Sequence, residues 1–286
     1  MRATSVLAVG TMLGEGPVWI EGALWFVDIK GRLIHRFDPA TGDARRWETP
    51  DQIGWILPAA SSEMIVGLRT GVHRFDPASG TYDQLHDPEP HSPGSRLNDA
   101  TTDTAGRLWF GTMDDDERAN TGRLYRCDNG RCVDTGAAPV AITNGPSISA
   151  DRRTLYHTDT LAKTIWRLPI DPAGHLGKPE RHIVIEEGAG HPDGSVLDAE
   201  GCLWTGLYGG WSVRRYDPAG KFMASVPFPV ANVTKIAFGG DGLRTAFATT
   251  ARKGLDAAAL ADQPEAGDLF AFDPGVAGLP VVAARI

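Results

Sequence analysis

The sequence predicts an all-β protein that folds as a six-bladed β-propeller, in a single domain over residues 1–286. A β-propeller is a ring of small four-stranded sheets around a central channel. Three observations lead to this fold class. The chain contains a sixfold internal repeat, its hairpins end in turn motifs, and no sustained 3.6-residue apolar period separates the repeats.

Each repeat begins with a short apolar strand, followed by a polar turn, a second strand and a tight turn. The first strands start 40 to 48 residues apart, which is the length of one propeller blade. Their first residues are Leu24, Met64, Leu108, Leu155, Leu203 and Ala246. We expect residues 4–9 to pair with the last blade near residues 280–286, because closing the ring hides free strand edges. The one helix-like patch, residues 256–260, is expected to lie in a loop.

The hairpin turns carry a recurrent Asp-Pro-Ala motif that ends in glycine, directly or after one further residue, and that includes Asp38, Asp76 and Asp217. Proline fixes one backbone angle of a turn, and glycine accepts the left-handed position. Recurrence at the same hairpin therefore indicates a structural role, and we assign these carboxylates no function.

Composition excludes several classes of protein. The chain has 28 Lys and Arg against 36 Asp and Glu, so its net charge is −8, and it has no basic run. We therefore expect neither a nucleic-acid partner nor binding to an anionic membrane. Three cysteines without CxxC spacing suggest neither a disulfide framework nor a zinc cluster. No apolar stretch reaches the length of about 18 residues that a transmembrane helix needs. We expect a cytoplasmic protein. We also expect a monomer.

Four polar residues occupy equivalent positions in four repeats, 9 to 11 residues before the repeat's first strand residue. They are Glu15, Asn98, Asn144 and Asp193. In a propeller such positions converge on the channel, where polar groups must be hydrogen-bonded or bound to a ligand. Oxygen donors of this kind suit a divalent cation: calcium, magnesium, manganese, zinc or ferrous iron. The alternative is that each residue only bonds its own turn, but four matching positions favour a metal site.

Further residues are candidates for contact with a ligand. Arg96 stands two residues before Asn98 and could bind a carboxylate, carbonyl or hydroxyl group. Trp55 lies in a predicted loop and is the candidate for stacking on a sugar-sized ligand. Asp159, His191 and Lys253 either face the cavity or lie on the surface, and Asp99 is expected to orient its own loop. The tryptophans that follow the strand pattern are expected to pack between blades: Trp19, Trp25, Trp109 and Trp204.

Five short motifs resemble, in order and over essentially the whole chain, the senescence marker protein (regucalcin)/gluconolactonase family. They are residues 14–17 (GEGP), 96–99 (RLND), 143–146 (TNGP), 192–194 (PDG) and 238–240 (FGG). Within the family, residues 111–113, 157–160, 232–235 and 250–255 are most similar to bacterial sugar lactonases such as xylonolactonase. The resemblance implies one divalent metal in the channel of a six-bladed propeller. It also implies hydrolysis of an aldonolactone, such as xylono-, arabinono- or gluconolactone, to the aldonic acid.

The resemblance also implies roles for individual residues. Glu15, Asn144 and Asp193 would bind the metal, and Asp193 would in addition act as the base that activates water. Arg96 and Asn98 would hold the sugar lactone, which moves Asn98 from the metal toward the substrate. Two other functions stay open from the residues alone. One is a non-enzymatic propeller with a structural metal, and the other is an organophosphate or ester hydrolase on the same metal site.

Overall fold

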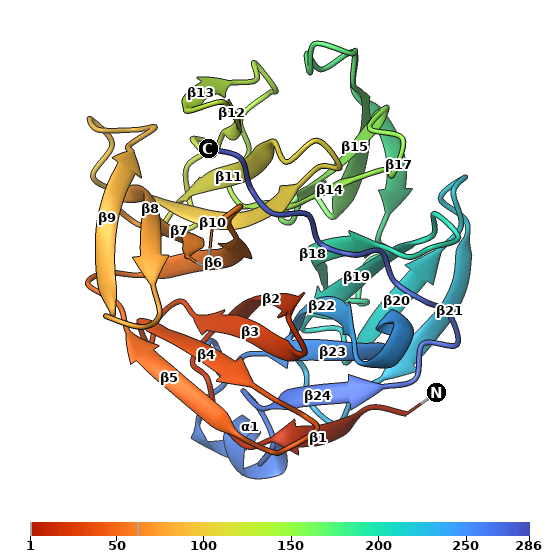
Figure 1. The fold of residues 1–286 in the computed structure, drawn as a ribbon. Helices are drawn as coiled ribbons and strands as arrows, with labels where there is room; N and C mark the ends of the chain where they lie inside the picture. The colour runs from red at the N-terminus through yellow and green to blue at the C-terminus, as the bar shows by residue number, and fades with distance from the viewer. Residues whose placement is uncertain (1, 62) are drawn as a thin grey trace.

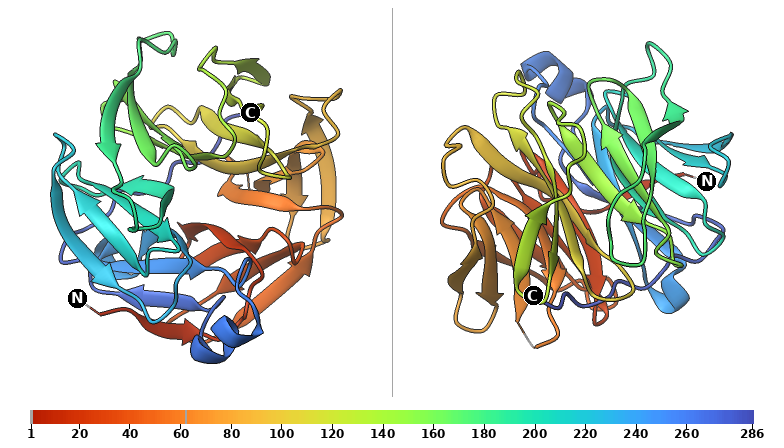
Figure 2. Two further views of the ribbon diagram at one scale, coloured as in Figure 1. Left: turned by 180° about the vertical axis from the view of Figure 1, so that it is seen from behind. Right: turned by 90° about the horizontal axis from the view of Figure 1, so that it is seen from above.

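Six four-stranded antiparallel sheets surround a central channel in the computed structural model, which describes residues 2–61 and 63–286. Figures 1 and 2 show the sheets arranged as the blades of a ring. The innermost strand of each blade contacts the innermost strands of the two neighbouring blades, so six strands line the channel. The predicted six-bladed β-propeller is confirmed.

The blades follow one another along the chain. The first contains β2 (Gly14–Ile20), β3 (Ala23–Asp28), β4 (Leu33–Phe37) and β5 (Ala44–Glu48). The second contains β6 (Ile53–Pro58), β7 (Met64–Leu68), β8 (Gly71–Asp76) and β9 (Thr81–His86). The third contains β10 (Ser95–Thr102), β11 (Leu108–Asp114), β12 (Leu124–Asp128) and β13 (Arg131–Asp134).

The remaining blades repeat this order from the channel outward. The fourth contains β14 (Thr143–Ile148), β15 (Thr154–Asp159), β16 (Thr164–Pro169) and β17 (Glu180–Val184). The fifth contains β18 (His191–Leu197), β19 (Leu203–Tyr208), β20 (Ser212–Tyr216) and β21 (Phe222–Pro227). The sixth contains β22 (Val233–Gly239), β23 (Thr245–Thr250), β24 (Leu269–Phe272) and the N-terminal β1 (Thr4–Leu7). Two short helices complete the fold: a 3-10 turn η1 (Asp241–Leu243) and α1 (Ala257–Asp262), which lies in the loop between β23 and β24.

Ring closure occurs in the sixth blade, but with a partner that differs from the prediction. The N-terminal strand β1 pairs antiparallel with β24, with Thr4 opposite Ala271, and not with residues 280–286. Strand β24 ends at Phe272, and Pro274, two residues further on, cannot donate to a ladder. The last residues instead run across the face of the ring that is nearest the viewer in Figure 1, to the second and third blades. There the Ala284 amide donates to the Pro58 carbonyl at 2.7 Å and the Arg285 amide to the Gly106 carbonyl at 2.8 Å.

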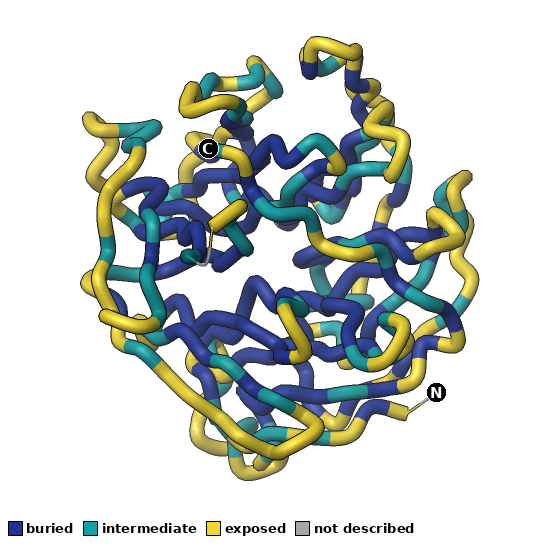
Figure 3. Tube along the Cα trace, in the orientation of Figure 1, coloured by how far each residue is buried: buried dark blue, intermediate teal, exposed yellow. Residues whose placement is uncertain are grey.

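Burial falls from the channel outward, as Figure 3 shows. Strand β3 is buried at every residue, whereas the outermost strand of the same blade, β5, is mostly exposed. The predicted packing role of the tryptophans is confirmed. Trp25, Trp109 and Trp204 are buried, and Trp19 of the first blade stacks on Phe247 of the sixth at 5.6 Å between ring centroids.

The predicted turn function of the recurrent aspartates is confirmed. The carboxylates of Asp38, Asp76 and Asp217 each accept a hydrogen bond from the amide two residues further on. These bonds close the turns, and all three carboxylates are remote from the channel's inner strands.

The cysteine prediction is wrong for one pair. Cys127 and Cys132 face each other across the β12–β13 hairpin, with 4.0 Å between their Cα atoms, and they form a disulfide. Their spacing in the sequence becomes a direct contact only because Asn129 and Gly130 make a tight turn with positive φ angles. Cys202 is a buried free thiol in the described structure. No helix among the described residues is long and apolar enough to cross a lipid bilayer.

Candidate functional site

The candidate site lies where the six inner strands are irregular. Every inner strand shifts register against the second strand of its blade, at the same level of the channel. Such β-bulges re-aim side chains away from the regular alternation of a strand. The shift follows Glu15 in β2 and Asn144 in β14. It includes Asn98 in β10 and Asp193 in β18. The equivalence predicted from the repeat spacing therefore has a structural basis.

Three carboxylates and one ammonium group are buried together at this level. Glu15, Asp99 and Asp193 are each at most 5% exposed. Lys235 of the sixth blade donates to Asp99 Oδ1 at 2.6 Å, and the Gly145 amide donates to Asp99 Oδ2 at 3.0 Å. When all four groups are ionised, the cluster has an excess of two negative charges. A buried charge needs a partner, and one divalent cation supplies the charge that is missing.

Burial makes this cluster unfavourable without a cation. Burial, followed by the charge of Asp193, raises the pKa of Glu15 well above its ordinary value. Burial, followed by the charge of Asp99, likewise raises the pKa of Asp193. Both shifts have the sign expected for carboxylates that are desolvated beside like charges. The described residues contain no group of three His, Cys, Asp or Glu side chains placed to hold a metal. A complete ligand set therefore requires an amide oxygen, such as that of Asn144.

Two asparagines have different hydrogen bonds. Asn98 Nδ2 donates to Asn144 Oδ1 at 3.0 Å and to the Thr143 carbonyl at 2.6 Å, while Asn98 Oδ1 accepts from Arg96. Asn144 Nδ2 donates to Thr160 Oγ1 at 2.9 Å, which fixes the direction of its amide oxygen. The Asn144 oxygen retains a lone pair for a cation. The Asn98 oxygen also keeps one lone pair, but it accepts its hydrogen bond from a positively charged guanidinium group.

Arg96 is held rigidly beside these amides. It is 2% exposed, and its Nε donates to Asp115 Oδ1 at 2.8 Å. Asp115 also accepts from Lys30 Nζ at 2.6 Å and from Gln52 Nε2 at 2.9 Å. Burial alone would raise the pKa of Asp115, but the hydrogen bonds from Lys30 and Gln52 outweigh it and hold that pKa well below its ordinary value. Asp115 therefore stays ionised and orients the guanidinium.

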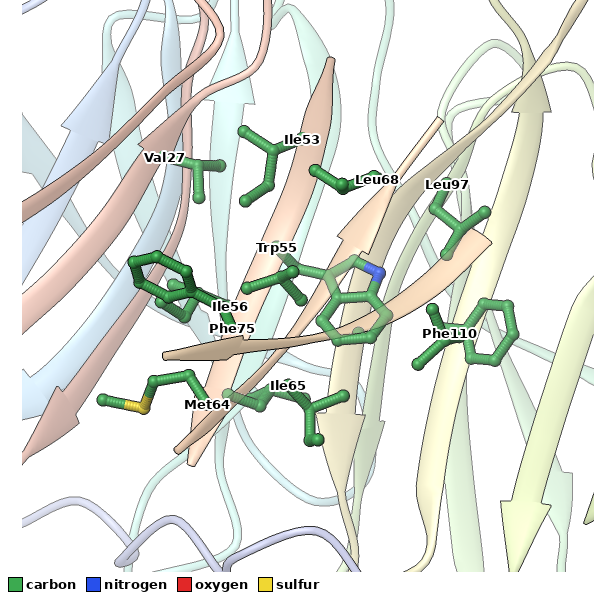
Figure 4. Close-up of a cluster of buried hydrophobic side chains, with 14 of the residues drawn as sticks. Val27, Ile53, Trp55, Ile56, Met64, Ile65, Leu68, Phe75, Leu97 and Phe110 are labelled. Carbon is green, nitrogen blue, oxygen red and sulfur yellow. The ribbon is translucent and has the colours of Figure 1, made fainter. Parts of the chain in front are cut away.

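The prediction that Trp55 stacks on a ligand is wrong. Its side chain is 1% exposed and packs in the hydrophobic core against Phe110, with ring centroids 6.0 Å apart (Figure 4). Gly67 on the next strand leaves space for the indole, since a Cβ there would lie 2.2 Å from Trp55 Cε2. Trp55 belongs to strand β6 and not to a loop, and its side chain lies in the hydrophobic core.

The other candidates differ in their surroundings. Asp159 is partly buried, which raises its pKa, and it accepts from the Ala162 amide at 3.2 Å. His191 Nδ1 bonds the Thr160 carbonyl at 3.2 Å. Lys253 forms an ion pair with Glu117. Asp99 bonds the amide of its own neighbour Ala100, as expected, but also the distant Lys235.

Two residues of the site, Lys235 and Asp115, are not among those predicted from the sequence. Lys235 had a usable signal, because it stands as far before Ala246 as Asn144 stands before Leu155. Asp115 and Glu117 lie in a run of acidic residues between two strands, where no spacing distinguishes one from another. Their roles depend on which strands the ring brings together.

The family model described as SMP-30/gluconolactonase/LRE-like region matches residues 13–252. The chain belongs to this family. A 6-deoxy-6-sulfogluconolactonase of Pseudomonas putida is 33% identical, over 94% of this chain and 93% of that protein. A pentonolactonase of Haloferax volcanii is 32% identical, over 98% and 97%. Among solved structures, a calcium-binding regucalcin from Agrobacterium tumefaciens has a TM-score of 0.94 at 29% identity, covering 99% of this chain and 97% of that one. The family predicted from the five motifs is confirmed.

Proposed function

We propose that this protein of the SMP-30/gluconolactonase family is a sugar lactonase that hydrolyses an aldonolactone to the aldonic acid with the help of one divalent cation. One observation carries the proposal: the buried cluster of Glu15, Asp99, Asp193 and Lys235 lacks two positive charges in a channel lined by oxygen donors. The names of the Pseudomonas and Haloferax relatives support sugar lactones as the substrate class. In this proposal Glu15, Asn144 and Asp193 bind the cation.

The residues present fit such a cation, because carboxylate and amide oxygens are ligands for hard and borderline divalent ions. When bound, the cation would polarise a lactone carbonyl and lower the pKa of water. Asp193 takes the proton from the attacking water.

Arg96 and Asn98 bind and orient the substrate in this proposal. The guanidinium is fixed by Asp115 and offers donors to hydroxyl and carbonyl oxygens of the lactone. Fixed hydrogen-bond donors suit a polyhydroxylated sugar ring better than they suit the apolar groups of a phosphotriester. The same donors place charge beside the oxygen on which negative charge develops as water attacks.

The test measures proton release from xylono-, arabinono- and gluconolactone after chelation, and again after each divalent cation is restored. We expect one cation to restore saturable hydrolysis, and we expect Asp193→Asn to lower kcat by about 10²–10⁴-fold, the usual contribution of a general base. Glu187→Gln is the matched control, because Glu187 has 93% of its side chain exposed.

If lactone hydrolysis stays at its spontaneous background rate with every cation, the lactonase proposal is contradicted. Calorimetric binding of a cation would then indicate a propeller with a structural metal, and hydrolysis of a phosphotriester would indicate the other hydrolase. Near-normal turnover by folded Asp193→Asn protein would contradict the assignment of the base.

A further inference from the structure

An ion pair connects two blades on opposite sides of the ring. Lys253 follows β23 in the sixth blade, and Glu117 lies in the loop between β11 and β12 in the third. Their ammonium and carboxylate groups are in direct contact. Inner strand β10 of the third blade contacts β6 and β14, while β22 of the sixth contacts β18 and β2. Two blades therefore separate the partners in either direction around the ring.

The ion pair lies at the end of the channel where the candidate site opens. Strand register places Asp114 at the end of β11 opposite Ser95, next to Arg96. It likewise places Thr250 at the end of β23 opposite Val233. Burial raises the pKa of Tyr208, and the negative charges of Asp193 and Glu117 add to the shift. Glu117 and Asp193 thus both lie within electrostatic range of the same hydroxyl.

Both partners are held in place by their own backbone surroundings. The Lys253 amide donates to the Met12 carbonyl at 2.9 Å, and its carbonyl accepts from the Tyr208 hydroxyl and from Asn232 Nδ2. The loop that carries Glu117 is closed by Asp114, whose carboxylate accepts from the amides of Arg118 and Ala119 at 3.0 and 2.9 Å. The two charged side chains are 32% and 34% exposed. They are accessible to a solute at the channel mouth, but they are partly shielded from water.

The pair has no net charge, and this limits which ligands can approach it at low cost. A neutral polyhydroxylated lactone can accept a hydrogen bond from the ammonium and donate one to the carboxylate while the ions stay paired. A lactone with a carboxylate, sulfonate or phosphate group would attract Lys253 but would be repelled by Glu117. It would also have to separate two ions whose attraction is stronger in a partly shielded site than in water.

We propose that the Glu117–Lys253 pair is a specificity determinant at the channel mouth, which favours neutral polyhydroxylated lactones and disfavours anionic ones. In this respect the protein would differ from the Pseudomonas relative, which is named for a lactone with a sulfonate group. This inference rests on the lactonase function proposed above. In this inference, two residues outside the metal cluster recognise the part of the substrate that is remote from the reacting carbonyl.

The test compares kcat/KM for gluconolactone and for its analogue with a sulfonate at the terminal carbon. Glu117→Gln removes the repulsion, so we expect the ratio of anionic to neutral kcat/KM to rise about tenfold, equivalent to about 1.4 kcal/mol. Lys253→Met leaves the carboxylate unpaired, so we expect the ratio to fall and KM for gluconolactone to rise about fivefold while kcat stays within twofold. Lys253→Arg keeps the charge and should stay within twofold of the wild-type ratio.

Lys163→Met is the matched control. Lys163 follows β15 at the same end of its blade, and it pairs with Glu187 at 2.7 Å, a residue of the β17–β18 connection. This change removes the same charge without affecting the Glu117–Lys253 pair, and the ratio should not move.

Equal ratios in wild type, Glu117→Gln and Lys253→Met would overturn the inference. A fall in kcat at unchanged KM in Lys253→Met would also overturn it, because the lysine would then act in the reaction and not in selection. Absence of lactone hydrolysis by the wild-type protein would contradict the proposed function itself, so the two failures are distinguishable.

Discussion

Replacing Lys235 with methionine tests whether the buried charges of the channel act as one cluster. Lys235 is 7% exposed and its partner Asp99 is 1% exposed, so the change leaves a carboxylate buried without its cation. An unbranched side chain is needed, because a Cβ on Gly194 would lie 2.6 Å from the Lys235 chain. Methionine keeps this shape and removes only the charge.

The expected loss of stability follows from the burial of the pair. Removing one partner of a buried ion pair costs about 3–5 kcal/mol. For a protein of this size class, 1 kcal/mol corresponds to about 2–4 °C in Tm, so we expect Tm in chelator to fall by about 10 °C. The excess negative charge of the cluster rises from two to three. A divalent cation should therefore stabilise the variant more than it stabilises the wild type.

The assay is thermal unfolding followed by tryptophan fluorescence, in chelator and with excess calcium. The double variant Asp99→Asn/Lys235→Met removes both charges, and we expect it to recover most of the lost stability because no buried charge is left unpaired. The reasoning is refuted if Lys235→Met in chelator is as stable as the wild type. It is equally refuted if the double variant is no more stable than the single one.

Two further predictions concern parts of the fold outside the cluster. Burial lowers the pKa of His157 to about 4, and in the described structure its Nδ1 has no hydrogen-bond partner. The unfolded chain takes up a proton below about pH 6.5 and the folded protein does not, so stability should fall by about 3 kcal/mol as the pH drops from 6.5 to 4. Denaturation midpoints measured against pH should show this loss in the wild type and not in His157→Gln; parallel curves would contradict it. Removing residues 279–286 deletes four hydrogen bonds to the second and third blades, including that from Ala60 N to Ala284 O. At about 1 kcal/mol each, Tm should fall by roughly 10 °C and the Ala60 amide should exchange faster; an unchanged Tm would show that the C-terminal segment does not hold the ring together.

The sequence alone determined the repeat, the blade count and most of the candidate metal site. Strand alternation, turn motifs and the 40- to 48-residue spacing are local signals, readable without knowing which strands meet. Equivalent positions in different repeats must converge in a closed ring. For this reason Glu15, Asn98, Asn144 and Asp193 were found together although they are far apart along the chain.

Only the tertiary structure decided the contacts between unlike segments. Lys235 pairs with Asp99 and Lys253 with Glu117 across 136 residues each, about the length of three repeats, but this spacing does not say which charged residues of opposite blades meet. The burial of Trp55 and the pairing of β1 with β24 likewise depend on how neighbouring blades pack and where the last blade ends. A sequence repeat determines the features that all six blades have in common, such as strand order and turn position. The ion pairs, the strand that closes the ring and the packing of individual side chains depend on residues that differ between blades. These residues meet only once the ring has formed.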